Sequence, residues 1–186
     1  MTDARVLRSR AGLRQALLML LETTPVEQIT IRDIAASAGV GYTTYFRHYP
    51  SKEALLQDLA AEEVRRLSDL TIPVYDAADP HAACLALCTY VDQHRILWSA
   101  LLTGALGFVR EEMLRQGREA AAARPHSWLP GDLGIVLSAT VIVELLAWWL
   151  RQADPPPAAL MAEVLDRTVI SPVQPASTAE RPATLG

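Results

Sequence analysis

The chain has 186 residues, of which 51% are hydrophobic and 20% charged, with a formal net charge of −4 and a pI near 5.6. It is too apolar for a disordered chain, and no glycine or proline period indicates a fibrous protein. The length favours one domain, or a small and a medium domain that share a core. Two cysteines are too few for a disulfide framework, and arginines interrupt any secretory signal near the N-terminus, so we expect a cytoplasmic protein.

The net negative charge hides an asymmetry between two parts of the chain. Residues 1–52 carry seven basic and four acidic side chains, a net charge of +3, whereas the other 134 residues carry a net charge of −7. Such an asymmetry indicates that the N-terminal part faces an anionic partner, although an excess of three charges can also arise by chance.

Helical spacing of apolar residues predicts a first helix over residues 5–22. A second, short helix is expected after Thr30, because threonine is a good N-cap and Asp33, three residues later, resembles the partner residue of a capping box. Gly39 suits the left-handed conformation that ends such a helix. A third short helix is predicted over residues 41–48, since the residue before a proline disfavours the α conformation.

A fourth helix begins after Ser51 and extends to about Leu70, and the proline-containing residues 71–80 are predicted to form a linker. The tail, residues 171–186, is predicted to be disordered. No strand pattern competes with the helices, so the fold class is all-α. The further helices are predicted at about 81–93, 95–103, 105–123, 131–153 and 157–170.

Residues 29–56 have the pattern of a helix-turn-helix, in which a short helix, a turn and a second short helix follow one another. Small residues such as Ala35 and Ala38 let the two helices approach, and the second helix is left free to enter a DNA major groove about 12 Å wide. That helix presents hydroxyls, aromatic rings and one guanidinium, groups that suit phosphate oxygens and thymine methyl groups. We interpret Phe46 and Tyr49 as core residues. An ordinary helical hairpin would leave the run of exposed hydroxyls unexplained.

This stretch resembles the TetR family of transcriptional regulators. The matching residues are Thr30, Asp33-Ile34-Ala35, Ala38-Gly39-Val40, Thr44 to Tyr49 and Ser51 to Leu56. The resemblance covers about residues 5–60. It implies a homodimer whose two helix-turn-helix heads grip a palindromic operator, and a divergent C-terminal helical domain that binds a small effector, which releases the DNA.

We predict the DNA contacts from the family resemblance and from the residues that the second helix presents. Phe46 stands where the family usually has a tyrosine whose hydroxyl meets a phosphate, so this interaction is either missing or taken over by Tyr45. The predicted DNA-binding residues are Thr30, Arg32, Gly41, Tyr42, Thr43, Thr44, Tyr45, Phe46, Arg47, His48 and Lys52. The predicted domains are a DNA-binding head (1–52), a ligand-binding and dimerisation domain (53–170) and the tail (171–186).

The longest apolar run, residues 133–150, is interrupted only by Glu144. Its length approaches that of a membrane span, but a central glutamate is costly there, and a helix between a core and a partner subunit has the same pattern. We therefore predict a subunit interface and no membrane. One residue of the Trp148-Trp149 pair is expected to face the partner and the other the core. The predicted interface residues are Val141, Leu145, Trp148, Trp149, Gln152, Leu160, Val164, Leu165 and Thr168.

An effector pocket should be lined by the middle helices, although plain core packing is an alternative for each apolar candidate. Glu144 is interpreted either as a buried acceptor for an effector or as the partner of an arginine across the interface. The predicted ligand-binding residues are Cys88, Val91, Trp98, Leu102, Phe108, Met113, Trp128 and Glu144.

His81, Cys84 and Cys88 lie on one helical face and offer a metal or thiol-sensing alternative, but no fourth ligand accompanies them. No metal and no cofactor is predicted, and no nucleophile, phosphate loop or carboxylate pair indicates an enzyme. From the TetR resemblance we predict a homodimeric repressor of double-stranded operator DNA that a small, largely apolar effector releases. The rival interpretation is an all-α ligand- or partner-binding protein that has lost DNA binding.

Overall fold

The structure is a computed structural model that describes residues 2–76, 79–121 and 129–173. Helices form nearly all of the regular structure in these ranges, which contain no strand, so the predicted all-α class is confirmed. The elements are α1 (Thr2–Leu21), α2 (Ile31–Ser37), α3 (Tyr42–Phe46), α4 (Lys52–Asp76), α5 (Pro80–Gln93), α6 (Arg95–Gly104), α7 (Leu106–Ala121), α8 (Leu133–Leu150), α9 (Ala158–Leu165), the π-helical turn η1 (Asp166–Ile170) and α10 (Ser171–Val173).

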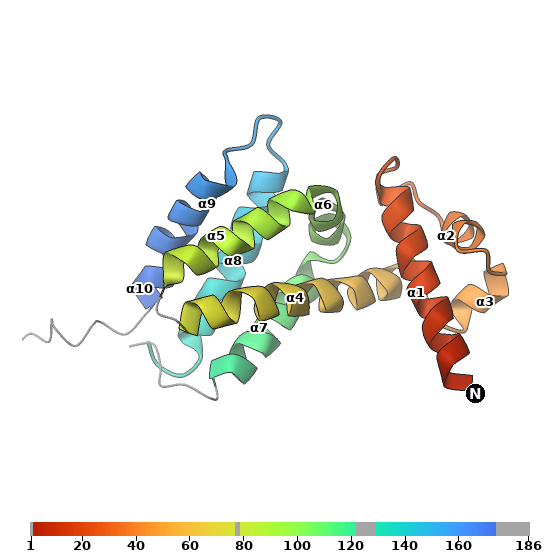
Figure 1. Ribbon diagram of the computed structural model, residues 1–186, viewed down its shortest axis with the longest axis horizontal. Coiled ribbons are helices and arrows are strands. Elements are labelled where there is room, and N and C mark those ends of the chain that lie inside the picture. Colours follow the sequence, from red (N-terminus) through yellow and green to blue (C-terminus); the bar gives the residue numbers. More distant parts are fainter. Residues whose placement is uncertain (1, 77–78, 122–128, 174–186) are drawn as a thin grey trace, which may run out of the picture.

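The molecule has two regions joined by α4 (Figure 1). A head made of α1, α2 and α3 lies at one end, and α4 runs from it into a body made of α5 to α10. In the body, α4 packs against α5 and α7, α7 packs against α8, and α5 packs against α9.

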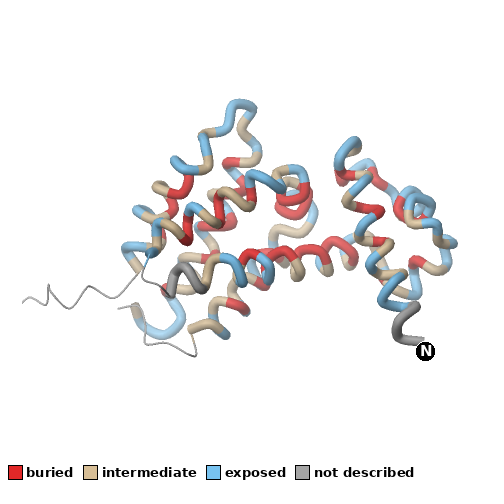
Figure 2. The backbone as a smooth tube through the Cα atoms, viewed as in Figure 1, coloured by how far each residue is buried: buried red, intermediate tan, exposed pale blue. Residues whose placement is uncertain are grey.

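The core of the head follows the apolar spacing of the sequence. Leu13, Leu17 and Leu21 of α1 are buried together with Ile34 and other apolar residues of α2. Figure 2 shows this buried set at the head and a larger one where the body helices face each other. Apolar burial of this kind is the main source of helical stability in proteins.

Two predicted boundaries differ from the structure. The predicted linker over residues 71–80 is wrong in its first part, because α4 continues through Pro73 to Asp76. A proline inside a helix removes one backbone hydrogen bond, and the packing of α4 against α5 and α7 outweighs that local preference. The predicted disorder of the tail is wrong for residues 171–173, which are helical. The rest of that tail lies outside the described residues.

Candidate nucleic-acid interface and effector cavity

The helix-turn-helix is built by hydrogen bonds that follow directly from its residue types. The Oγ1 of Thr30 accepts from the backbone N–H of Asp33 at 3.2 Å, and a carboxylate oxygen of Asp33 accepts from the backbone N–H of Thr30 at 2.9 Å. This reciprocal pair confirms the predicted capping box. The same carboxylate accepts from the Thr30 hydroxyl, and these bonds lower the pKa of Asp33. The turn is made by Gly39, whose φ of 66° is the left-handed value that favours glycine.

The outward side of α3 carries two aromatic rings and a hydroxyl. Tyr42 and Phe46 are 47% and 44% exposed, and their ring centroids lie 5.2 Å apart in an edge-to-face arrangement. The guanidinium carbon of Arg32, on α2, lies 5.6 Å from the centre of the Tyr42 ring. Thr43 and Arg47 are also exposed, whereas Thr44 and His48 are half-buried. The interpretation of Phe46 as a core residue is therefore wrong, because α3 places this ring at the surface.

Tyr45 has the opposite position from the one predicted. Its side chain is fully buried, and its hydroxyl donates a hydrogen bond to the backbone oxygen of Ser51 at 3.0 Å. Burial raises the pKa of this hydroxyl. Tyr45 is a core residue that fixes α3 to the start of α4, so its hydroxyl is not available to bind a phosphate in place of Phe46. Tyr49 is buried as predicted.

Lys52 and Thr30, which are predicted to contact DNA, also make hydrogen bonds within the head. The ammonium of Lys52 donates to the backbone oxygens of Val26 at 2.7 Å and Ile29 at 2.9 Å, which ties α4 to the loop before α2. An ammonium has three donors, so one remains for a phosphate. The Thr30 hydroxyl uses its single hydrogen in the capping box.

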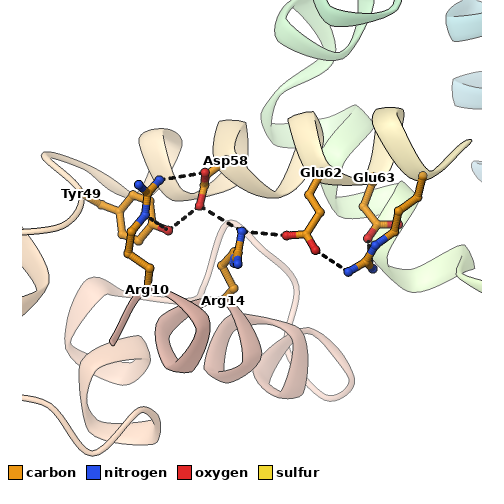
Figure 3. Close-up of polar contacts among 7 residues, drawn as sticks. Arg10, Arg14, Tyr49, Asp58, Glu62 and Glu63 are labelled. Atoms are coloured by element: carbon orange, nitrogen blue, oxygen red, sulfur yellow. Dashed lines mark hydrogen bonds and ion pairs between the residues drawn. The ribbon is translucent and has the colours of Figure 1, made fainter. Parts of the chain in front are cut away.

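A series of polar contacts connects α1 to α4 at the joint between head and body (Figure 3). Arg10 donates to Asp58 at 2.9 Å, and Arg14 lies 2.7 Å from Glu62. The hydroxyl of Tyr49 donates to the other oxygen of Asp58 at 2.5 Å, and burial, together with this bond, raises the pKa of Tyr49. The head is thus attached to one side of α4 by alternating charges.

The same series continues into the body. Arg66 pairs with Glu62 and lies 2.8 Å from Glu63, a carboxylate that is only 3% exposed. Glu63 also accepts from the hydroxyl of Tyr90, on α5, at 2.7 Å. Burial and this contact raise the pKa of Tyr90 to about 12. A buried carboxylate is stable only when it is paired in this way.

The body contains a cavity of about 350 Å3 between α4, α5, α7 and α8, and residues of α9, η1 and α10 complete its wall. Its volume falls within the range typical of small-molecule sites. Most of the lining is apolar, from residues such as Leu67 on α4, Leu87 on α5 and Ile142 on α8. The cavity is therefore the candidate effector site.

Among the described residues predicted to bind the effector, only Met113 lines this cavity. Cys88, Val91, Trp98 and Leu102 are buried elsewhere in the core, which was the alternative left open for them. Phe108 is half-buried outside the lining, and Trp128 lies outside the described residues. Glu144 is exposed on α8, so its interpretation as a buried acceptor is wrong.

Small residues make room for the cavity, and none of them was among the predicted ligand-binding residues. Gly134, Ser138 and Ala139 line it from α8, and Gly117 lines it from α7. An added Cβ on Gly117 would lie 2.7 Å from the side chain of Ile135, so only glycine permits this approach of the two helices. In the sequence, the recurrence of small residues one turn apart on two consecutive helices could have indicated this cavity.

The outer face of α8 is exposed and mostly apolar, with the exposed Glu144 between Val141 and Trp148. Leu133, Leu137, Val141 and Trp148 recur at helical spacing and are each 37–45% exposed. As expected, the two tryptophans point in different directions. Trp148 is exposed, whereas Trp149 is fully buried and its indole N–H donates to the backbone oxygen of Pro156 at 2.7 Å.

The interface prediction is wrong for Trp149 and Leu165, because both side chains are buried in the core of a single chain. Leu160 on α9 is 48% exposed. Thr168 is also exposed, and the remaining predicted residues, Leu145, Gln152 and Val164, are half-buried.

Within the described residues, α8 is the one helix whose length and composition would suffice to cross a membrane. Its mean hydropathy is 2.1, and 39% of its residues are buried. Since α8 packs against α6, α7 and η1, its apolar character has an origin in helix packing.

The cysteine cluster offers no metal site among the described residues. His81 lies 3.7 Å from a carboxylate oxygen of Asp166. Burial raises the pKa of both Cys84 and Cys88 to about 12, which keeps them as neutral thiols at neutral pH.

Comparisons with known proteins agree with this geometry. Residues 13–59 match the family described as bacterial regulatory proteins, tetR family. A nucleoid occlusion factor, SlmA of Shewanella frigidimarina, is 32% identical over 85 residues, which cover 45% of this chain and 43% of that protein. The transcriptional repressor LfrR of Mycolicibacterium smegmatis is 37% identical over 73 residues, covering 39% of this chain and 35% of LfrR. The matched part thus spans less than half of these relatives.

The fold extends further than the sequence similarity. The crystal structure of the multidrug binding protein EbrR complexed with imidazole superposes with a TM-score of 0.65 at 17% identity, covering 92% of this chain and 98% of EbrR. At this identity the likeness concerns the fold alone, and it includes the body as well as the head.

Proposed function

The chain belongs to the TetR family of bacterial regulatory proteins, and on that premise we propose that it is a cytoplasmic, homodimeric repressor released from its operator by a small effector. The observation that carries the DNA-binding part is the exposed side of α3. Tyr45 fixes α3 from within, and Tyr42, Thr43 and Arg47 are presented outward with Arg32 beside them. Hydroxyl, guanidinium and aromatic groups on a short helix suit the phosphates and base edges of a major groove.

Fixed contacts matter here because the head carries little charge. A net charge of +3 over residues 1–52 supplies only a weak electrostatic attraction to DNA. Two copies of the head on one DNA would double the contacts and make binding depend on their spacing. This requirement agrees with the exposed apolar face of α8, which we assign, with Leu160 on α9, to the subunit interface.

Helix α4 provides the connection between effector and DNA. Asp58 and Glu62 attach it to α1, whereas Leu67, Ser68 and Thr71 line the cavity one to three turns further along. Ten residues of α-helix, from Asp58 to Ser68, span about 15 Å. An effector that favours one position of α4 would therefore shift the population toward differently spaced heads.

DNA binding is tested by gel shift on the DNA upstream of the gene that encodes the chain. Arg47→Ala should weaken binding and reduce the salt dependence by about one ion, because it removes one exposed phosphate-seeking charge. Thr43→Ala and Thr44→Ala should weaken binding while the oligomeric state is unchanged. Ser99→Ala, in the body, is the matched control. Failure of the unmodified protein to bind this DNA specifically would support the rival, a ligand- or partner-binding protein that has lost DNA binding.

The dimer is tested by sedimentation equilibrium. Val141→Glu puts a second carboxylate, one turn from Glu144, into the proposed interface and should give monomers that no longer bind the operator. Leu85→Glu is the matched control, because Leu85 on α5 is as exposed as Val141 and α5 is not part of the proposed interface. A dimer that survives Val141→Glu would place the interface elsewhere.

A further inference from the structure

We propose that the cavity binds an uncharged, mostly apolar molecule whose hydroxyl or carbonyl group hydrogen-bonds to Ser68 on α4 and Ser138 on α8. The proposal rests on the effector role assigned to the cavity above and gives the ligand its chemical class.

The first argument is the charge of the cavity wall. Among the described residues that line it there is no aspartate, glutamate, histidine, lysine or arginine. The only titratable side chain in this described lining is Cys84, whose pKa burial raises to about 12, so the thiol is neutral. A charged group placed inside the cavity would lose hydration without gaining a counter-charge from the described lining, which is strongly unfavourable in an apolar site.

Several ionic groups on the surrounding helices have partners outside the lining or are exposed. On α7, Arg115 pairs with Glu112 and Glu119, and Arg118 pairs with Asp132 before α8, at 2.8 Å. On α4, the ionic side chains nearest to Ser68 in sequence, at positions 65, 66 and 69, are exposed. None of these groups belongs to the lining.

The second argument is the pair of serines. Ser68 and Ser138 both line the cavity and are half-buried, and neither hydroxyl has a hydrogen-bond partner among the described residues. Thr71 differs, because its hydroxyl already donates to the backbone oxygen of Leu67 at 2.9 Å. A few polar groups in an apolar wall orient a ligand, and unpaired hydroxyls are the groups available to do so.

The position of Ser68 links binding to regulation. Ser68 is on α4, which carries the head, whereas Ser138 is on α8, which carries the proposed subunit interface. A ligand that bonds to both would hold α4 at a set distance from α8. The hydrogen-bonding group is thus the part of the ligand expected to decide release, and the apolar part supplies affinity.

The test uses calorimetric titration of the full chain with probes on one skeleton: naphthalenemethanol, its methyl analogue methylnaphthalene, naphthoate and naphthylmethylammonium. We expect the alcohol to bind at least about 100-fold more tightly than either ion at pH 7. Ser68→Ala and Ser138→Ala should each weaken the alcohol about 3- to 10-fold and the methyl analogue less than about twofold, because only the alcohol loses a hydrogen bond. Ser99→Ala, a serine outside the cavity, should change neither.

Three results would overturn the proposal: an ion that binds as tightly as the alcohol, an alcohol affinity unchanged in both serine variants, or no binding of any probe. Operator binding by the probe-free protein is measured in parallel. If the probe-free protein does not bind the operator, the regulator function is contradicted. If it binds the operator but prefers a charged probe, only the ligand class is contradicted.

Discussion

The head and the body of this protein are stabilised in different ways. In the head, polar side chains have definite partners: Thr30 with Asp33, Tyr45 with the backbone of Ser51, and Lys52 with two carbonyl oxygens. In the body, the wall of the 350 Å3 cavity is mostly apolar, and Ser68 and Ser138 lack partners among the described residues. The head thus keeps a fixed shape, as contacts with DNA require, and the body retains space for a ligand.

The most damaging change expected is Tyr45→Ala, which empties the centre of the head. Truncating a fully buried aromatic side chain costs about 3–5 kcal/mol. The head should unfold before the body, giving two thermal transitions by circular dichroism. Tyr45→Phe keeps the ring and should cost only about 1 kcal/mol, the contribution of one hydrogen bond. If Tyr45→Phe instead abolished DNA binding at full stability, the Tyr45 hydroxyl would contact DNA after all.

A smaller effect is expected at the joint, where Asp58→Ala removes the partner of Arg10 and Tyr49. The hydroxyl of the buried Tyr49 loses its acceptor, at a cost of about 1–3 kcal/mol in the free energy of unfolding. Operator affinity should fall as well, because the head is less firmly held on α4. Asp69→Ala, at an exposed position on the same helix, is the control and should change neither quantity measurably. Equal behaviour of the two variants would show that the joint does not position the head.

Replacement of small hydroxyl residues compares the two regions directly. Thr30→Ala should cost about 1 kcal/mol, because it removes an N-cap with two partners. Ser138→Ala should change stability by less than about 0.5 kcal/mol, because its hydroxyl has no partner among the described residues to lose. Urea titrations of both variants measure the difference. If Ser138→Ala lowered the free energy of unfolding as much as Thr30→Ala, the proposed difference between head and body would be contradicted.

The smallest predicted effect is a pH dependence of the cap. The pKa of Asp33 is lowered in the folded chain by its bonds from Thr30. Its contribution is therefore fully present above the unfolded value near 3.8 and is lost as the pH falls through the lower folded value. The stability difference between the unmodified chain and Thr30→Ala should shrink in strong acid, as measured by urea titration at several pH values. A difference that stays constant would show that Asp33 does not take part.

The local pattern of the sequence was enough to predict the head. Thr30, Asp33 and Gly39 define the ends of α2 through their own side chains and backbone preferences, and the leucines of α1 show its buried side by their spacing. These features depend on residues a few positions apart. The family resemblance rests on the same stretch.

Tertiary structure alone decided what depends on distant segments. Whether Tyr45 or its neighbour Phe46 faces solvent is set by where α4 and the backbone at Ser51 lie, and both rings suit either position. The continuation of α4 through Pro73 depends on packing against α5 and α7. The cavity exists where small residues of α7 and α8 meet residues of α4 and α5, so its lining could not be read from any single helix. Large apolar residues were natural candidates for that lining, but most of them fill the core, and the smaller side chains leave the space.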